Sequence, residues 1–332
     1  MNSFGRVFRI SIYGESHGWG VGCLIDGCPP GLALSVSEFQ EDLERRRSHA
    51  AGTTKRQEKD IPLIRSGVFE GKTTGAPLHI AFENKEKRSE DYENIRYLPR
   101  PGHADFTAAK KFFGFNDYRG GGQFSGRMTV ALVAAGVIAK KIISPVRVNA
   151  GVIEAGGTAE VKKAVREAVE SNDSIGGIIE CVATKMPAGL GEPFFDSVES
   201  LISHLVFSIP GVRGIEFGSG FSSARMKGSV HNDPIINVKG ETSTNHSGGI
   251  NGGLTNGNPL VFRVAVKPAS SIPKPQKTIN LLSGEIDNLA IKGRHDSCFA
   301  LRTPVIVEAA TASVLADLVL TQRTWERKLE ED

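Results

Sequence analysis

Residues 119–141 read RGGGQFSGRMTVALVAAGVIAKK, a glycine-rich polar loop that runs directly into an apolar segment. Gly120, Gly121 and Gly122 allow backbone conformations that a Cβ atom would forbid. The chain is then almost continuously apolar from Met128 to Ile143, and a helix that is apolar on all sides is buried. Because this segment has about 14 residues, whereas a membrane-spanning helix needs about 20, we expect the central core helix of a soluble protein.

The polar loop before this helix is a candidate anion site. Its residues include Gln123, Ser125 and Arg127, which are small or polar. Backbone N–H groups and the helix dipole favour a negative charge at a helix N-terminus. The alternative is a surface loop that precedes a core helix, and a single glycine motif does not decide between the two.

The composition of the 332 residues is that of a soluble globular protein, with 39% hydrophobic and 23% charged residues. The net charge of +3 is too small to indicate nucleic-acid binding, although clusters of basic residues suit a small anionic ligand. The four cysteines show neither a C-x-x-C pair nor metal-ligand spacing, which favours reduced thiols and no metal. The first ten residues lack a signal-peptide core, and no stretch qualifies as a membrane span. We therefore expect a cytoplasmic protein that binds neither a membrane nor nucleic acid.

Alternating and helical patterns predict a single α+β domain over residues 1–332, because neither a repeat nor a linker divides the chain. The long polar segment Gly228–Gly257 is of the kind that is either functional or disordered. Pro304–Trp325 is expected to hold a strand-like PVIVE followed by a helix. The predicted strands are Arg6–Ile12, Val21–Asp26, Ile61–Phe69, Ala76–Phe82, Val146–Glu154, Gly177–Thr184, Ile209–Phe221 and Pro259–Val266. The other predicted helices are Ser37–Arg47, Thr107–Phe113, Thr158–Asn172 and Val198–Phe207.

Four short segments combine a rigid Gly or Pro backbone with a titratable side chain: Gly14–Gly18, Arg100–Asp105, Gly120–Thr129 and Gly293–Cys298. Histidine can move a proton near neutral pH, and arginine binds phosphate or carboxylate through two parallel hydrogen bonds. Together these segments predict acid–base chemistry on a phosphorylated, carboxylated substrate. Any one histidine could instead be a hydrogen-bonded turn residue, and zinc, dinucleotide and P-loop motifs are absent from the sequence.

Seven motifs in series resemble those of the chorismate synthase family. In order they are GESHG (14–18), RPGHAD (100–105), DYRGGG with the S-x-R that follows it (117–127), GIEFGSGF (214–221), NHSGGINGG (245–253), KPASSI (267–272) and GRHDSC (293–298). Their order and spacing agree from about Phe4 to Leu320. The resemblance implies a β-α-β sandwich, in which central helices pack between two antiparallel sheets, and assembly as a homotetramer.

The resemblance also implies an activity. Members are lyases of the shikimate pathway, in aromatic amino acid biosynthesis, that convert 5-enolpyruvylshikimate 3-phosphate to chorismate and phosphate by an anti 1,4-elimination. They require reduced FMN although the reaction has no net redox change. Whether the flavin is reduced by this protein with NADPH or by an external flavin reductase stays open. The alternatives are an FMN-dependent oxidoreductase acting on a phosphorylated carboxylate, and a non-catalytic RNA-binding protein using Arg45–Arg47, Lys55 and Arg56.

Residue roles follow from the same resemblance. His17 is expected to be the acid that assists the departing phosphate, and His103 is expected to protonate or stabilise the reduced flavin. Asp296 is expected to act together with the flavin in removing the ring proton. The implied substrate-binding residues are Ser16, Arg46, Arg100, Ser125, Arg127 and Arg294. The implied flavin-binding residues are Gln123, Phe124, Ser125, Pro210, Gly211, Gly252, Lys267, Pro268, Ala269, Ser270, Ser271 and Arg294. Three places depart from the family pattern: many relatives carry a basic residue at Gln123 and an arginine near Ala51, and in many the region around Gly151–Asn172 is longer.

Overall fold

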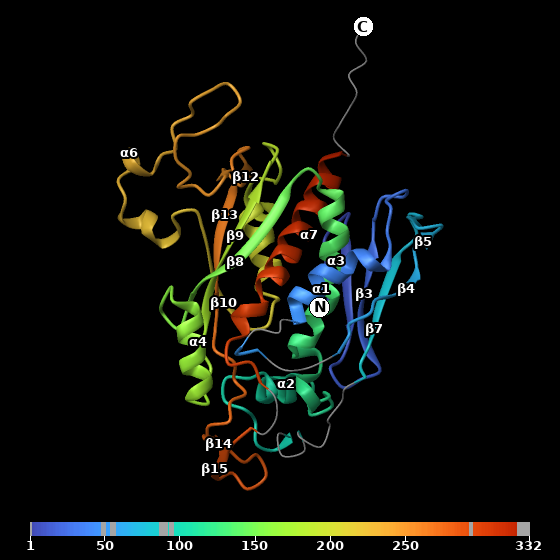
Figure 1. Ribbon diagram of the computed structural model, residues 1–332, viewed down its shortest axis with the longest axis vertical. Helices are drawn as coiled ribbons and strands as arrows, with labels where there is room; N and C mark the ends of the chain where they lie inside the picture. Colours follow the sequence, from blue (N-terminus) through green and yellow to red (C-terminus); the bar gives the residue numbers. More distant parts are fainter. Residues whose placement is uncertain are drawn as a thin grey trace.

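Two antiparallel sheets form the outer layers of the protein (Figure 1). The structure is a computed structural model that describes residues 2–47, 51–53, 58–85, 92, 96–291 and 295–323. The first sheet has the order β1-β2-β3-β7-β4 and the second β10-β13-β9-β8. The strands of the first are β1 (Ser3–Phe4), β2 (Arg9–Gly14), β3 (Gly20–Asp26), β7 (Leu78–Glu83) and β4 (Leu63–Ser66). Those of the second are β10 (Val212–Phe217), β13 (Leu260–Val266), β9 (Gly177–Thr184) and β8 (Arg147–Ala155).

Helices α3 (Thr129–Ile142) and α7 (Pro304–Arg323) lie between the two sheets (Figure 1). Every residue of α3 except Lys140 and Lys141 is buried, as the all-round apolar sequence predicts. The two helices approach so closely that a side chain at Gly136 would overlap Ala309. One hydrophobic cluster joins side chains of both sheets and both helices. The predicted β-α-β sandwich is therefore confirmed. That residues 1–332 form a single domain stays a prediction.

The first residues of α7 correct the sequence analysis. PVIVE was expected to be strand-like, but it forms the beginning of this 20-residue helix. Pro304 suits the first helical position, where its missing N–H is not needed, and burial between two sheets outweighs the weak helix propensity of β-branched residues. The sequence analysis expected no stretch long and apolar enough to cross a membrane, but α7 meets this criterion by length and composition. However, 83% of the 18-residue apolar segment that meets it is buried inside the protein.

The remaining elements surround this sandwich. The polar segment 228–257 is not structureless, since it contains α6 (Gly228–His231), β11 (Ile250–Asn251) and β12 (Leu254–Thr255). The predicted strand at 61–69 is divided into β4 and β5 (Val68–Phe69), and β5 pairs with β6 (Lys72–Thr73). The predicted strand 209–221 is limited to β10 and is followed by a 3-10 helix, Gly220–Arg225. The other elements are α1 (Gln40–Arg47), α2 (Asp105–Lys111), α4 (Val161–Glu170), α5 (Val198–Val206), β14 (Gln276–Ile279) and β15 (Ile286–Leu289).

Candidate active site

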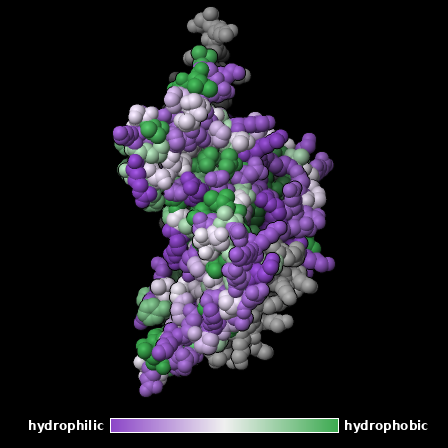
Figure 2. Space-filling model, turned by 60° about the vertical axis from the view of Figure 1, so that its left-hand side comes forward, coloured by the Kyte–Doolittle hydropathy of each residue, from purple (hydrophilic) through white to green (hydrophobic). Residues whose placement is uncertain are grey.

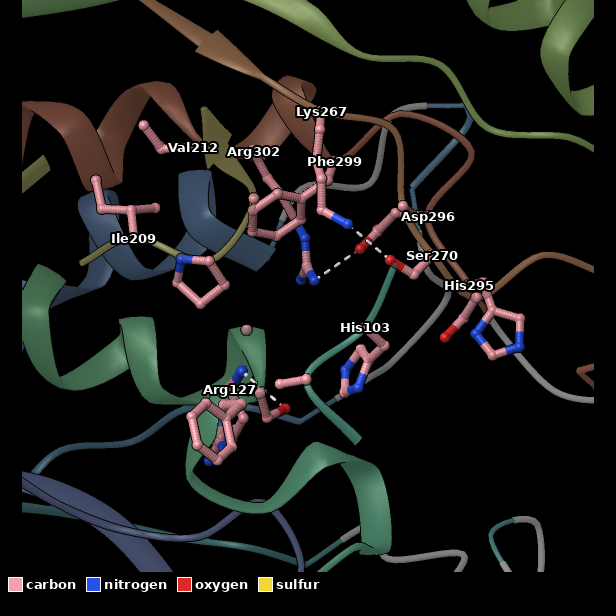
Figure 3. A pocket seen from close by; sticks show the side chains of 18 of the residues that line it. His103, Arg127, Ile209, Val212, Lys267, Ser270, His295, Asp296, Phe299 and Arg302 are labelled. Atoms are coloured by element: carbon pink, nitrogen blue, oxygen red, sulfur yellow. Dashed lines mark hydrogen bonds and ion pairs between the residues drawn. The ribbon is translucent and has the colours of Figure 1, made fainter. Parts of the chain in front are cut away.

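A cavity of about 740 Å³ is lined by loops from distant parts of the sequence (Figure 3). Its volume is in the range of sites that hold small molecules and cofactors. Arg127 lies on one side of the cavity, and Asp296 and Arg302 lie on the opposite side (Figure 3). The lining residues come from six segments, within 46–60, 100–107, 120–127, 207–213, 267–271 and 295–302.

The triple-glycine loop lies between two imidazoles. Gly120, Gly121 and Gly122 have φ values of 59°, 82° and 53°, a region that favours glycine. A Cβ atom at Gly120 would be 2.5 Å from Cδ2 of His17, and one at Gly121 would be 3.3 Å from Nε2 of His103. The glycines thus bring both predicted catalytic histidines against the same loop.

Ser16 and His17 lie behind this loop, not on the cavity wall. They are 1% and 6% exposed, and the backbone N–H of Ser16 donates to the carbonyl of Gly122. Gly120 itself lines the cavity. Because Gly120 has no side chain, the His17 imidazole lies directly against the backbone of the loop that lines the cavity.

His103 is held by a carboxylate that the sequence analysis did not single out. Asp105 accepts a hydrogen bond from Nδ1 of His103 at 2.7 Å and two from the Arg100 guanidinium, at 2.7 and 2.8 Å. Burial raises the pKa of Asp105, but the hydrogen bonds from Arg100 and His103 outweigh it and hold the pKa well below its usual range. An ionised carboxylate can only accept hydrogen bonds, so we place the hydrogen of the imidazole on Nδ1, in the contact with Asp105. Nε2 is then the ring nitrogen that lies beside Gly121. The sequence did contain a signal for this carboxylate, because Asp105 is the last residue of the RPGHAD motif.

Two of the predicted anion-binding arginines share one carboxylate, Asp60. Nη2 of Arg46 is 2.6 Å from Oδ2 of Asp60. Arg127 is paired with the other oxygen of Asp60 and with Glu58, at 3.1 Å. Burial lowers the pKa of Arg46 to about 10, against the opposing effect of Asp60. Sequence reasoning missed Glu58 and Asp60, because nothing in a polar loop shows which carboxylates will meet a buried arginine pair.

The opposite wall contains a second ion pair and a lysine. Nη2 of Arg302 is 2.8 Å from Oδ2 of Asp296, and its guanidinium lies over the ring of Phe299, 5.2 Å from the centroid. Nζ of Lys267 donates to the carbonyl of Gly102 at 2.6 Å and to Oγ of Ser270 at 2.8 Å. Burial lowers the pKa of Lys267, and the positive charge of Arg213 lowers it further.

Most of the predicted site residues meet in this cavity. Gly252 does not line it, because it lies in the turn between β11 and β12, and Arg294 lies outside the described residues, as do Lys55 and Arg56. The predicted residues that line the cavity are Arg46, Arg100, His103, Gln123, Phe124, Ser125, Arg127, Pro210, Gly211, Lys267, Pro268, Ala269, Ser270, Ser271 and Asp296. Lining residues that the sequence analysis did not assign include Arg47, Glu58, Asp60, Arg213, Phe299 and Arg302.

Comparison with known proteins agrees with this fold and site. The family model described as chorismate synthase matches residues 8–320. A chorismate synthase of Chitinophaga pinensis is 58% identical, over 98% of this chain and 99% of its own. One of Thermococcus kodakarensis is 44% identical, over 97% and 98%. A crystal structure of chorismate synthase superposes with a TM-score of 0.75 at 27% identity, covering 96% of this chain and 93% of that one.

The fold, the acid–base groups and these relatives define an enzyme of the lyase type. More particularly, the chain belongs to the chorismate synthase family.

Proposed function

We propose that this enzyme converts 5-enolpyruvylshikimate 3-phosphate to chorismate and inorganic phosphate, using reduced FMN. The observation that carries the proposal is one glycine loop packed against two imidazoles: His103 lines a cavity rich in cations, and His17 lies directly behind the loop. The reaction breaks the carbon–oxygen bond to phosphate and one ring carbon–hydrogen bond. The electron pair of the latter completes a second ring double bond, so that phosphate and a proton leave without net oxidation.

The charges of the cavity suit a substrate with a phosphate and two carboxylates. Fixed cations stabilise both the bound anion and the negative charge on the leaving group. Arg46 and Arg127 are already positioned by Asp60, so they need not reorganise when the substrate binds. The described cations of the lining are Arg46, Arg47, Arg100, Arg127, Arg213, Lys267 and Arg302, whereas its carboxylates are Glu58, Asp60 and Asp296.

Three residues would handle the protons. His17 would donate toward the departing phosphate from its place beside Gly120. His103 would hold or move a proton at Nε2, because Asp105 fixes its Nδ1. Asp296 would take part in removing the ring proton, and the nearby Arg302 keeps this carboxylate in place.

The residues of the cavity fit FMN. Phe124, Ile209, Pro210 and Phe299 offer apolar surface for a flat ring, while hydroxyl and ammonium groups at 267–271 can bind a phosphate. Nε of Arg46 and Nε of Arg302 are buried and have no hydrogen-bond partner among the described residues, as expected of donors that await a ligand. When bound, reduced FMN would supply electron density to the reacting ring.

Assembly as a homotetramer belongs to the same proposal. Hydrophobic atoms gather at the lower end of the molecule in Figure 2, the end that the β14–β15 hairpin forms in Figure 1. Leu282 and Ile286 of this hairpin region are 71% and 74% exposed, and the projecting segment around α6 exposes Ile235, Ile236 and Val238. Exposed apolar side chains that cluster in this way favour contact with another protein surface, for which a second copy is the simplest candidate.

An anaerobic assay with chemically reduced FMN tests the proposal. Chorismate absorbance and released phosphate should rise together while the flavin stays reduced. An FMN-dependent oxidoreductase would instead oxidise one flavin for each product formed. Replacing His17 or His103 by alanine should slow turnover by about 10²- to 10⁴-fold, and wild-type rates in either variant would refute the role given to that residue. Adding NADPH with oxidised FMN, with and without a flavin reductase, shows which source of electrons the enzyme needs.

A further inference from the structure

The carboxylate of Asp117 closes the turn that leads into the triple-glycine loop. Its Oδ1 accepts hydrogen bonds from the backbone N–H of Arg119 at 3.1 Å and from Nε of Arg119 at 2.8 Å, while its Oδ2 accepts one from Nη2 at 2.8 Å. Both oxygens are thus bound to a residue only two positions further along the chain. Because such paired, charged hydrogen bonds fix geometry, the turn sets the direction in which the chain enters Gly120.

Asp117 and His17 pack against the same loop. A Cβ atom at Gly122 would be 2.3 Å from the backbone oxygen of Asp117 and 3.9 Å from its Cβ, and one at Gly120 would be 2.5 Å from the His17 ring. The carbonyl of Gly122 also accepts the backbone N–H of Ser16, the residue before His17, at 3.2 Å. Neither Asp117 nor His17 lines the cavity. The three glycines thus connect the carboxylate of one residue with the imidazole of the other.

Charge couples the two side chains as well. Burial raises the pKa of Asp117, but hydrogen bonds from Arg119 and the positive charges of Arg119 and His17 outweigh it, so this pKa is below its usual value. An interaction between two charges is mutual, and an ionised Asp117 therefore favours the protonated form of His17. A protonated imidazole is the form that can act as an acid.

The other described titratable groups around this imidazole do not cancel the charge of Asp117. The side chain of Arg119 is 41% exposed, so water screens its charge, whereas the side chain of Asp117 is only 13% exposed. Glu15, two residues before His17, is a second carboxylate, and its charge acts on Arg119. Tyr92 packs edge-to-face on the imidazole, with ring centroids 5.1 Å apart. Together these groups favour a positive charge on His17.

We propose that Asp117 is a positioning residue of the reaction, which holds the glycine loop against His17 and stabilises the protonated imidazole. When His17 gives its proton to an oxygen of the departing phosphate, the imidazole becomes neutral and Asp117 stays ionised. Each imidazole at this loop then has its own carboxylate, Asp105 for His103 and Asp117 for His17. The inference rests on the proposed function, because the role of His17 as an acid is part of it.

Two substitutions separate the charge of Asp117 from its part in the turn. Asp117→Asn keeps the size of the side chain and an acceptor for Arg119, but it removes the negative charge. Arg119→Gln removes the ion pair and leaves Asp117 ionised. In NMR spectra of protein labelled in its histidine nitrogens, the His17 resonance is identified by its absence from His17→Ala. At one fixed pH near neutrality it should move toward the neutral form in Asp117→Asn but not in Arg119→Gln. A move toward the neutral form in both variants, or in neither, would overturn the inference.

Turnover gives the second readout. Asp117→Asn should lower kcat about 10- to 100-fold, the usual effect of removing a partner behind a functional side chain, with little change in KM. In the His17→Ala background the same substitution should cause almost no further loss, because the group through which it acts is gone. Asp117→Glu should recover part of the rate. Losses that multiply in the double variant would show that Asp117 does not act through His17.

The control is Asp173→Asn, since Asp173 also accepts a backbone N–H, from Ser174, and a charged donor, from Lys274, and does not line the cavity. It should keep the wild-type kcat and the wild-type His17 resonance, and urea unfolding should show that each variant is folded. If wild-type protein forms no chorismate, the proposed function fails and the inference fails with it. If wild type turns over normally and Asp117→Asn equals it in rate and in the His17 resonance, only the inference fails.

Discussion

Asp105 accepts a hydrogen bond from Nδ1 of His103 at 2.7 Å while it also binds the guanidinium of Arg100 through both oxygens. One carboxylate therefore fixes the orientation of an imidazole and of a cation that line the same cavity. Because this carboxylate is ionised and its side chain is only 6% exposed, the geometry is set before any ligand binds.

Replacing Asp105 by asparagine should lower kcat by about 10²- to 10⁴-fold, the usual contribution of a positioned acid–base group. The amide can donate to Nδ1, which would move the imidazole hydrogen to Nε2 and leave Arg100 with a neutral partner. The hydrogen-bonded imidazole resonance in the NMR spectrum should shift or vanish in the variant. Asp173→Asn is the matched control, because Asp173 forms an exposed ion pair with Lys274 and neither residue lines the cavity. Normal turnover by Asp105→Asn would contradict the positioning role.

Gly120→Ala should abolish most of the activity, because the new Cβ would lie 2.5 Å from the His17 ring and 2.8 Å from Oγ of Ser16. Gly114→Ala is the matched control: Gly114 also has a positive φ, of 80°, but no atom lies within 4 Å of its Cβ position. Both variants should lose about 1 kcal/mol of stability from backbone strain. Only Gly120→Ala should lose turnover in the anaerobic assay. Similar rates for the two would show that the fit between the loop and His17 does not matter.

The pairing of Asp60 should make stability depend on pH in the acid range. Burial raises the pKa of Asp60, but Arg46 and Arg127 outweigh it, so the folded-state pKa is below the unfolded value of about 3.9. The stabilisation is therefore fully present above that unfolded value and is lost as pH falls through the folded pKa. Urea unfolding between pH 7 and pH 2.5 should show a steeper loss for wild type than for Asp60→Asn. Parallel curves would contradict the assignment.

Asp317 is expected to hold the N-terminal segment against α7. Its Oδ1 accepts hydrogen bonds from the backbone N–H groups of Arg6, Val7 and Phe8, at 2.7 to 2.9 Å, and the side chain is buried. Asp317→Ala leaves these donors without an acceptor and should lower the free energy of unfolding by about 2–4 kcal/mol. Asp26→Ala, at an exposed carboxylate, should change it by less than about 1 kcal/mol. The free energies from urea unfolding decide between these values.

The central helix and the two sheets could be predicted because their patterns are local. α3 is apolar on every face, and a helix of that kind has to lie in the core. PVIVE misled because tertiary burial outweighed the propensity of its β-branched residues. The pairing of Asp60 with two arginines depends on a loop that returns to α1 and to the turn before α3, and the unpaired place of Arg213 in the sheet depends on a one-residue bulge. Neither relationship leaves a trace in the spacing of the residues.

The turn that contains Gly252 shows a second limit of sequence reasoning. Motif resemblance assigned it to the flavin site; it does not line the cavity of this chain, and its role in binding flavin stays a prediction. Resemblance identifies which residues a family shares, but it does not state which of them meet within one chain.

The most direct test of the account is the anaerobic reaction of the purified enzyme with reduced FMN and 5-enolpyruvylshikimate 3-phosphate. Chorismate and phosphate should appear in equal amounts over many turnovers, and the flavin spectrum at the end should still be that of the reduced form. Folded protein that forms no chorismate, or that oxidises one flavin for each product, would contradict it.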